Sequence, residues 1–505
     1  MNETFDVVVA GAGPVGLMLA CELRLGGAEV LVVERLTEPD MTIKAGAINV
    51  PTAQAFYRRG MLPELLEQQN ATVQRIRAAG MAPNAAGQRL PIAGHFAGIM
   101  LRAGEIDFDD PVFADLGPGA EAVLVVQQAI EAILARRAAE LGIEVRRGVA
   151  LTEFDDDGTA VTVHFGDRTV RADWLVGCDG GRSTVRKLAG FDFPGLDPEI
   201  TGHQAVVEMT GAEGLRPGWN TTETGIYASG PTPGRILTVE LDGPPADRTT
   251  PVTAAELQAS LRAVSGVPVE ITAVHSATRF TDNTRQVTDY RKGRVLLAGD
   301  AAHVHSPFGG QGLNLGIGDA VNLGWKLAAV VRGDVSETLL DTYTAERHPV
   351  GAWVLDWTRA QVALMRLDQR SKALRAVMID LLATRDGATA ISKRISGVLH
   401  RYDLGGRHDL IGAVAPDIEL SDGSRVGMHC ADGRAILLDL ADSAELRTIA
   451  RPWSDLVHIV TAKPVAPREL SAMLIRPDGY VAWAADSGQR DGLDEALRRW
   501  FGHKS

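Results

Sequence analysis

A glycine-rich turn near the start of the chain constrains its fold more than any other feature. Residues 5–35 read FDVVVAGAGPVGLMLACELRLGGAEVLVVER, so that two apolar runs flank a stretch with helical spacing. Gly11, Gly13 and Gly16 form a G-x-G-x-x-G pattern where the first run meets the helix. In this context glycine permits a tight turn, lets backbone approach a pyrophosphate, and lets the helix pack closely on the strand. The pattern predicts a strand–helix–strand unit that binds a dinucleotide.

Neighbouring residues of this unit fit the same ligand. The helix that starts at Pro14 would present free N–H groups and the positive end of its dipole to phosphates. Glu34 ends the second strand, where a carboxylate can accept hydrogen bonds from a ribose diol. We therefore include Pro14, Glu34 and the adjacent Arg35 in the predicted cofactor site.

A second candidate stretch, residues 293–314, reads GRVLLAGDAAHVHSPFGGQGLN. Its apolar run predicts a buried strand that ends at Asp300, whose carboxylate could accept a hydrogen bond from a ribityl hydroxyl. The helix expected from about Gly312 would offer N–H donors to an anionic ring carbonyl. On these residues alone, an aspartate that caps a helix beside a flexible loop is an equally good interpretation.

Charge and cysteine content argue against several other functions. The formal net charge is −13 and no strongly basic stretch offsets it, so we expect neither nucleic acid nor an anionic membrane as a partner. Cys21, Cys178 and Cys430 are far apart and odd in number, so no disulfide framework or cysteine-based zinc site is expected. No uncharged apolar run is long enough to span a membrane, and the chain starts with a strand rather than a signal peptide. We expect a cytoplasmic protein.

Four histidines are candidate metal ligands, namely His95, His303, His305 and His348. No carboxylate cluster accompanies the pair at 303 and 305, so we expect no metal site.

The remaining pattern suits two to four structural units in 505 residues. We expect a helix over residues 51–70, a strand pair in GHFAGIML at 94–101, a β-rich layer over 192–277 and a helical region over 312–398. A linker is expected at 402–408, before a new run of strands. Six large side chains offer either an apolar surface for a flat ligand or ordinary core: Phe96, Phe108, Phe113, Met209, Trp219 and Tyr227.

Two further strand ends, Asp179-Gly180 and Gly299-Asp300, follow the glycine turn in an order that carries a family resemblance. Together the motifs resemble the class A flavoprotein monooxygenases, the FAD aromatic hydroxylases built like para-hydroxybenzoate hydroxylase. Within that family the chain is most similar to actinobacterial aromatic polyketide hydroxylases and to tetracycline- and rifampicin-type oxygenases. The motifs behind the narrower match lie at residues 94–98, 176–186, 309–316, 319–327, 340–343 and 346–349.

The resemblance implies non-covalent FAD and a role for each matching residue. It assigns Gly11, Gly13 and Gly16 to the diphosphate, Glu34 to the adenosine ribose, and Gln127 to the ribityl chain and flavin edge. It also assigns Asp300 to the ribityl or diphosphate region, Pro307, Gly312, Leu313 and Asn314 to the neighbourhood of the flavin ring, and Asp179 to FAD and NAD(P)H handling.

Two positions depart from the family pattern: Lys44, and Pro51, which stands where an arginine is common just before the following helix. Lys44 stands where the family usually has an arginine over the flavin, and lysine keeps the charge but loses the planar fork. Lys44 is therefore a possible flavin-side cation, whereas no other catalytic residue is indicated. Because there is no second G-x-G-x-x-G unit, NADPH or NADH is expected to dock transiently on the FAD domain.

The implied fold is α/β, with a Rossmann-like FAD-binding domain, an inserted β-rich substrate domain and a C-terminal thioredoxin-like domain without C-x-x-C. The expected boundaries are 1–70, 106–190 and 285–400 for the FAD-binding domain, 71–105 and 191–284 for the substrate domain, and 403–505 for the last.

The implied function is hydroxylation of a polycyclic aromatic polyketide in antibiotic biosynthesis, with NAD(P)H and O2 as cosubstrates, through a flavin hydroperoxide. Baeyer–Villiger oxygenation of a similar polyketide is the alternative within the same chemistry. A flavin-binding protein without turnover is the alternative of another class. We expect a monomer or a homodimer.

Overall fold

The computed structural model describes residues 3–78, 92–120, 123–166, 168–230, 232–248, 250–487 and 489–503, and its largest sheet is built on the N-terminal glycine turn. In this sheet β1 (Glu3–Ala10) lies between β2 (Val30–Glu34) and β8 (Arg168–Gly177), parallel to both. The strand order is β16-β17-β8-β1-β2-β5, and β7 pairs with both β8 and β6. The remaining strands are β5 (Glu144–Arg147), β6 (Glu153–Asp156), β7 (Val161–Phe165), β16 (Arg291–Lys292) and β17 (Val295–Leu297).

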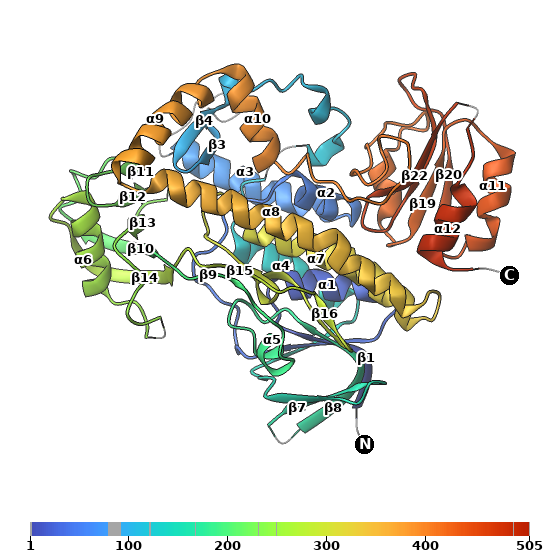
Figure 1. Cartoon of the computed structure of the whole chain (residues 1–505), viewed down its shortest axis with the longest axis horizontal. Helices are drawn as coiled ribbons and strands as arrows, with labels where there is room; N and C mark the ends of the chain where they lie inside the picture. The colour runs from blue at the N-terminus through green and yellow to red at the C-terminus, as the bar shows by residue number, and fades with distance from the viewer. Residues whose placement is uncertain are drawn as a thin grey trace.

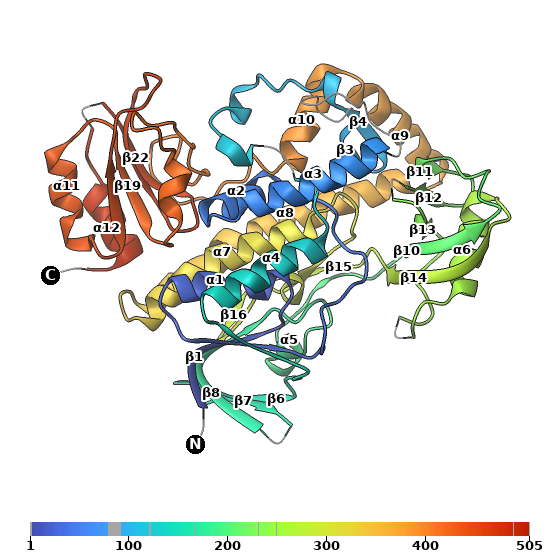
Figure 2. The same cartoon turned by 180° about the vertical axis from the view of Figure 1, so that it is seen from behind.

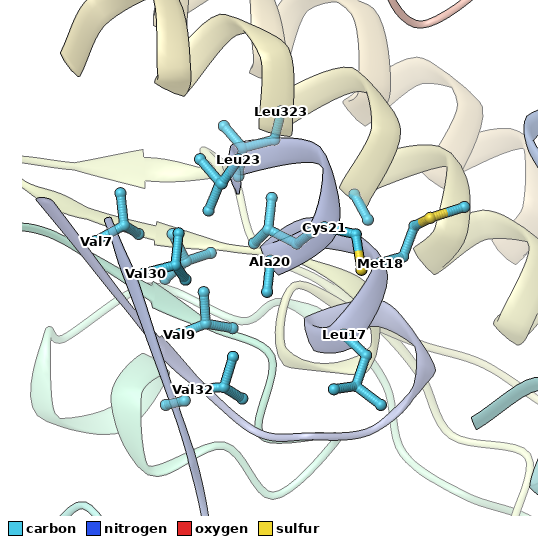
Figure 3. Packing of buried hydrophobic residues seen from close by; sticks show 14 of the residues in the cluster. Val7, Val9, Leu17, Met18, Ala20, Cys21, Leu23, Val30, Val32 and Leu323 are labelled. Carbon is cyan, nitrogen blue, oxygen red and sulfur yellow. The ribbon is translucent and has the colours of Figure 1, made fainter. Parts of the chain in front are cut away.

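Helix α1 (Pro14–Leu25) follows β1 and covers one face of this sheet. Figure 3 shows Val7, Val9 and Val30 facing Leu17 and Leu23 of the helix. All of these side chains are buried, as expected for parallel strands covered on both faces. The predicted strand–helix–strand unit is therefore present.

A separate antiparallel sheet forms the β-rich layer that the sequence predicts. Its strand order is β11-β12-β13-β10-β14, and α6 (Ala254–Ser265) packs on one face through Leu257, Leu261 and Val264. Figure 1 shows this sheet in green, at one end of the molecule. The strands are β10 (Thr201–Thr210), β11 (Gly218–Thr221), β12 (Ile226–Ser229), β13 (Arg235–Glu240) and β14 (Glu270–Phe280).

Long helices connect the parts of the molecule. The region 312–398 contains α7 (Gly312–Val331), α8 (Asp341–Met365), α9 (Gln369–Leu382) and α10 (Arg385–Ile395). Figures 1 and 2 show α7 and α8 running side by side through the middle of the molecule.

The helix expected over 51–70 is wrong in one respect. Two helices occupy this stretch, α2 (Val50–Arg58) and α3 (Leu62–Ala78), because Gly60 adopts a left-handed conformation between them (φ +75°). The expected strand pair is present as β3 (Ile92–Phe96) and β4 (Ile99–Arg102). Residues 79–91 of the expected 71–105 segment lie outside the described residues.

The shorter elements complete the chain up to residue 402. They are α4 (Gln127–Glu140), α5 (Thr184–Leu188), β9 (Gly195–Leu196), β15 (Thr284–Gln286), β18 (His303–Val304), and the 3₁₀ helices η1 (Ala103–Glu105), η2 (Pro111–Phe113), η3 (Gly117–Gly119), η4 (Gly299–Ala301) and η5 (Glu337–Leu340).

Residues 403–503 form a further α/β layer, called the C-terminal unit below and drawn in red in Figure 1. Its strand order is β20-β19-β21-β22, in which β19 and β20 are parallel and the other pairs are antiparallel. Its elements are η6 (Val426–Cys430), β19 (Ala435–Asp439), α11 (Ala444–Ala450), η7 (Arg451–Trp453), β20 (Val457–Thr461), β21 (Leu470–Ile475), β22 (Val481–Asp486) and α12 (Leu493–Phe501).

The expected linker at 402–408 does not begin as an open connection. Tyr402 is buried, and its ring stacks on that of Tyr480 with centroids 4.1 Å apart. The start of this segment therefore belongs to the contact between the C-terminal unit and the helices beside it.

A buried ion pair between α1 and the end of α2 also contacts the C-terminal unit. Arg59 donates to both carboxylate oxygens of Glu22, at 2.7 and 2.6 Å, and both side chains are almost fully buried. The same guanidinium donates to the carbonyl oxygens of Cys430 (2.6 Å) and Pro477 (2.8 Å). One arginine thus joins α1, the end of α2, the end of η6 and the turn after β21.

Replacing Arg59 with methionine should strongly destabilise the protein. The change leaves the Glu22 carboxylate buried without its cation, which typically costs about 3–5 kcal/mol. Urea unfolding followed by circular dichroism measures the effect as a lower midpoint. Arg136→Met is the control, because Arg136 and its partner Glu64 are both exposed, and it should leave the midpoint almost unchanged. A wild-type midpoint for Arg59→Met would contradict this role for the pair.

Candidate cofactor and substrate site

The strands that carry the three cofactor motifs end at the same edge of the large sheet. Gly177 of β8 pairs with Ala10 of β1 on one side and with Leu297 of β17 on the other. The loops that follow these strands therefore leave the sheet side by side. Ligands of open α/β sheets bind at such a carboxyl edge, which makes this edge the candidate dinucleotide site.

The glycine turn separates into two tightly packed positions and one open position. Gly11 has φ +111°, and an added methyl group would lie 2.4 Å from the carbonyl oxygen of Cys178. A methyl group on Gly16 would lie 2.0 Å from the carbonyl oxygen of Gly11. At Gly13, by contrast, it would meet nothing within 4 Å. The space over Gly13 is open to a ligand, and α1 starts there without a side-chain cap, which leaves N–H groups for phosphate.

The Glu34 carboxylate stabilises this turn through hydrogen bonds to the backbone. It accepts hydrogen bonds from the backbone N–H groups of Ala12 and Leu36, both at 2.9 Å. A carboxylate has further acceptor positions, so ribose binding is compatible with these bonds. The neighbouring Arg35 is exposed.

Asp300 lies in the loop of residues 298–311 that joins β17 to α7, called the Asp300 loop below. Its side chain is exposed, and its Oδ1 lies 3.9 Å from a methyl group added to Gly312. Helix α7 begins without a side-chain cap, so its first N–H groups remain available. The Asp300 carboxylate and these donors therefore lie close together, and their role toward a flavin stays a prediction.

Asn314 holds the start of α7 against two neighbouring segments. Its Nδ2 donates to the Gly310 carbonyl oxygen at 2.8 Å, and its Oδ1 accepts from the backbone N–H of Asn49 at 2.8 Å. Leu313 beside it is buried, whereas Pro307 is exposed. Asn314 thus shapes the loop rather than presenting a free amide to a ligand.

Gln127 and Lys44 belong to neighbouring segments. Gln127 begins α4, and its backbone N–H donates to Ala45 at 3.0 Å while its side chain donates to Glu131 at 2.8 Å. The Lys44 ammonium pairs with the Asp40 carboxylate at 2.9 Å, and both are partly exposed. Burial raises the Asp40 pKa, but the hydrogen bonds from Lys44 and Thr42 together outweigh it, so the pKa is lowered. A flavin-facing role for Lys44 remains a prediction.

The Asp179 carboxylate stabilises the local fold through hydrogen bonds to the backbone. It accepts from the backbone N–H groups of Thr184 (2.6 Å) and Val185 (3.1 Å) and so secures the start of α5. The nearby Arg186 is buried and donates to the carbonyl oxygens of Ala301 (2.9 Å) and Gly181 (2.8 Å). These bonds tie the β8 loop to the Asp300 loop.

An aromatic cluster adjoins the Asp300 loop through Phe308. The ring centroid of Phe308 lies 6.1 Å from that of Trp219 and 6.0 Å from that of Phe280, both from the antiparallel sheet. His95 of β3 lies 4.8 Å from Trp219, and burial lowers the pKa of His95 to about 4, so its imidazole is neutral near pH 7. Phe308 therefore belongs both to the Asp300 loop and to the aromatic cluster.

The side chains that the sequence grouped together are divided by the structure. Phe96 and Trp219 belong to the cluster beside Phe308, whereas Tyr227 and Met209 pack on the opposite face of the sheet, against α6. Phe108 and Phe113 pair with each other at 5.9 Å.

Two site residues were missed by sequence reasoning. Gln361 of α8 is fully buried, accepts from the backbone N–H of Ala97 (3.0 Å) and donates to the Phe308 carbonyl oxygen (3.2 Å), so it fixes the β3–β4 turn against the Asp300 loop. The other is Arg235 of β13. Neither lies in a sequence pattern that indicates its role.

Arg235 is a cation on the aromatic side of the antiparallel sheet. Since alternate residues of a strand point to opposite faces, it shares a face with Leu237, which packs on the aromatic cluster. Its Nη1 lies 4.0 Å from a methyl group added to Gly46. Burial lowers its pKa, and within the described part of the chain no carboxylate or hydrogen-bond acceptor pairs with its guanidinium.

The residues present fit FAD: open space at Gly13, the Glu34 carboxylate at the end of β2, the exposed Asp300 carboxylate and the uncapped start of α7. Searched over the described ranges, the chain has no cluster of His, Cys, Asp or Glu that could hold a metal ion. No helix of the described chain is both long and apolar enough to cross a membrane.

A glycine turn of the dinucleotide-binding type at a sheet edge beside an aromatic face is typical of a flavoprotein oxidoreductase. Residues 4–358 match the family model "FAD binding domain", and residues 408–503 match "Aromatic-ring hydroxylase, C-terminal". The chain belongs to the FAD-dependent aromatic-ring monooxygenases, which use FAD with NAD(P)H and O2 as cosubstrates.

Relatives cover nearly the whole chain. The 12-dehydrotetracycline 5-monooxygenase/anhydrotetracycline 6-monooxygenase of Streptomyces rimosus subsp. rimosus is 41% identical over 99% of both chains. The rifampicin monooxygenase of Streptomyces venezuelae is 39% identical over 99% of both. The solved structure of an anhydrotetracycline hydroxylase from Streptomyces rimosus matches with a TM-score of 0.87 at 39% identity, over 99% of this chain and 100% of that one. The family resemblance in the sequence is confirmed.

Replacing Gly13 with alanine should abolish tight FAD binding without unfolding the protein. The added methyl group meets no protein atom within 4 Å, and the backbone there is extended (φ −75°), so folding should be normal. The methyl group would occupy the pyrophosphate position, and affinity for FAD should fall at least about tenfold. Fluorescence titration with FAD and thermal unfolding of the flavin-free protein measure the two effects. Unchanged FAD affinity would contradict this placement.

Proposed function

We propose that this FAD-dependent monooxygenase hydroxylates a polycyclic aromatic polyketide in antibiotic biosynthesis. The single observation that carries the proposal is Phe308, which lies in the Asp300 loop and also in the aromatic cluster of the antiparallel sheet. A flat aromatic ligand on this face would lie beside the flavin. The tetracycline and rifampicin monooxygenases that are 41% and 39% identical to this chain are named for antibiotic substrates of this kind, which supports the same substrate class here.

The protein's own residues bind the cofactor, orient the substrate and exclude water from the site. FAD, when bound, would supply the redox chemistry, in which a hydride comes from NAD(P)H, one oxygen atom of O2 enters the ring and the other leaves as water. Gln361 and Asn314 hold the loop segments that border the site, and the buried aromatic side chains keep water from it. The neutral His95 adds no charge to this apolar surface.

The cofactor roles are part of the proposal. Gly13 and the start of α1 would hold the diphosphate, Glu34 the adenosine ribose, and Asp300 the ribityl chain. The uncapped start of α7 at Gly312 would face the flavin pyrimidine ring, with Gln127 at the flavin edge. The open space at Gly13 and the exposed carboxylate of Asp300 support these assignments.

We also propose the domain division expected from the sequence. The FAD-binding domain would comprise 1–70, 106–190 and 285–400, and the substrate domain 71–105 and 191–284. The C-terminal unit would have a thioredoxin-like topology, a reading supported by its β20-β19-β21-β22 order with a parallel first pair and an antiparallel hairpin. Its one cysteine, Cys430, is buried.

Hydroxylation is favoured over Baeyer–Villiger oxygenation by the relatives, whose names are those of monooxygenases and hydroxylases. The experiment supplies NADPH or NADH, labelled O2 and a panel of angucycline, anthracycline and tetracycline precursors. We expect a product with one labelled oxygen as a ring hydroxyl and every carbocycle intact by mass spectrometry. A labelled lactone would overturn hydroxylation. FAD that no reduced nicotinamide reduces would indicate a binding protein without turnover.

Arg235 should contribute to recognition of an acidic oxygen on the substrate. A guanidinium without a protein partner on an apolar face can pair with a phenolate or enolate, so Arg235→Gln should lower kcat/KM by about ten- to a hundredfold. Arg216→Gln, an exposed change beside the same sheet, should leave kcat/KM unchanged. Reduction of FAD by NADPH should be equal in both variants. Full kcat/KM in Arg235→Gln would contradict the role.

A further inference from the structure

The buried carboxylate of Asp319, on α7, holds both sides of the turn that carries Asp300. Its Oδ2 accepts from the backbone N–H of Gly299 at 3.0 Å and from Nε2 of His303 at 2.7 Å. The side chains of Asp319 and His303 have no solvent exposure. Because Asp300 lies between Gly299 and His303 in the chain, one carboxylate holds the backbone before it and a side chain after it.

Arg347 of α8 holds the same carboxylate from the other side. Its Nε donates to Asp319 Oδ1 at 2.8 Å, and its Nη2 donates to the Leu315 carbonyl oxygen at 2.9 Å. A methyl group on Gly318 would lie 2.6 Å from that Nη2, so the absence of a side chain makes room for the guanidinium. Burial raises the pKa of Asp319, but His303 and Arg347 lower it below its ordinary value, so Asp319 stays ionised.

The C-terminal unit reaches this pair at two points. Arg347 Nη1 donates to the Tyr402 hydroxyl at 3.1 Å, and the Tyr402 ring stacks on Tyr480 of the C-terminal unit. One residue before Arg347, the Glu346 carboxylate accepts from Arg476 of the C-terminal unit at 2.9 and 2.7 Å. The part of α8 that carries Arg347 is thus clamped by the C-terminal unit.

We propose that Asp319 and Arg347 are positioning residues through which the C-terminal unit holds the Asp300 loop in the geometry that binds FAD. The contacts run without a gap from Tyr480 through Tyr402, Arg347 and Asp319 to the turn at Asp300. The C-terminal unit therefore contributes to the site by positioning the Asp300 loop, without contacting FAD itself. The proposal rests on FAD binding and is independent of which substrate is hydroxylated.

The test compares two relay variants with one matched control in the full-length protein. Asp319→Asn keeps the size of the side chain but replaces one acceptor oxygen with an NH2 group. That group faces N–H donors and cannot accept from them. Tyr402→Phe removes only the oxygen that Arg347 contacts and keeps the ring stack. Asp115→Asn is the control, because Asp115 pairs with Arg468 of the C-terminal unit at 2.6 and 2.7 Å without contacting α7 or α8.

Fluorescence titration of the flavin-free protein gives the Kd for FAD, and the visible spectrum reports the flavin environment. Asp319→Asn should weaken FAD binding by about tenfold and shift the visible bands, and Tyr402→Phe should weaken it by about two- to fivefold. Asp115→Asn should retain the wild-type Kd. Thermal unfolding without FAD identifies the variants that fold normally.

A folded Asp319→Asn protein with wild-type FAD affinity and spectrum would overturn the proposal. Should this variant not fold, Tyr402→Phe decides the matter, and an unchanged Kd there would refute the link to the C-terminal unit. Equal weakening in Asp115→Asn would show a general loosening of the interface and would also overturn it. If the wild type binds FAD normally but forms no product, the proposed hydroxylation would be contradicted. The proposed role of Asp319 and Arg347 would be unaffected.

Discussion

The parallel pairing of β1 with β8, and of β8 with β17, is the constraint on which the rest of the molecule depends. In a parallel arrangement the carboxyl ends of neighbouring strands point the same way, so the register of Ala10, Gly177 and Leu297 fixes where three loops emerge. Gly11 can start its loop only because it lacks a side chain, since a methyl group would overlap the carbonyl of Cys178. Loops far apart in the sequence are thereby brought within reach of one dinucleotide.

The parts of this site that could be predicted from the sequence are those with a local cause. Gly11, Gly13 and Gly16 are required by backbone geometry within one turn, and a buried strand followed by Gly299 and Asp300 is visible as an apolar run. The strand pair at 94–101 is equally local, and the structure contains it. The missed break at Gly60 is local too, but a single glycine in a helical pattern does not show whether the helix ends there.

The parts that could not be predicted depend on contacts between distant segments. Trp219 and Tyr227 lie on adjacent strands with similar surroundings in the sequence, yet they face opposite sides of the sheet. Only the pairing register decides this, because a shift by one residue would exchange the faces. Arg235 and Gln361 are inconspicuous for the same reason, since their roles exist only where β13 and α8 meet other segments.

Charged side chains are buried between α7, α8 and the C-terminal unit, and stability alone does not explain their presence there. Removing charged groups from water is costly, and well-packed apolar side chains of similar volume often serve stability as well or better. Lys326, Glu346 and Arg476 nevertheless form such a cluster, with contacts of 2.7 to 3.0 Å and almost no exposure. An apolar contact can slide, whereas paired charges with fixed donor directions satisfy one another in a single arrangement. An interface of this kind suits a molecule in which the position of α8 determines, through Arg347 and Asp319, the position of Asp300.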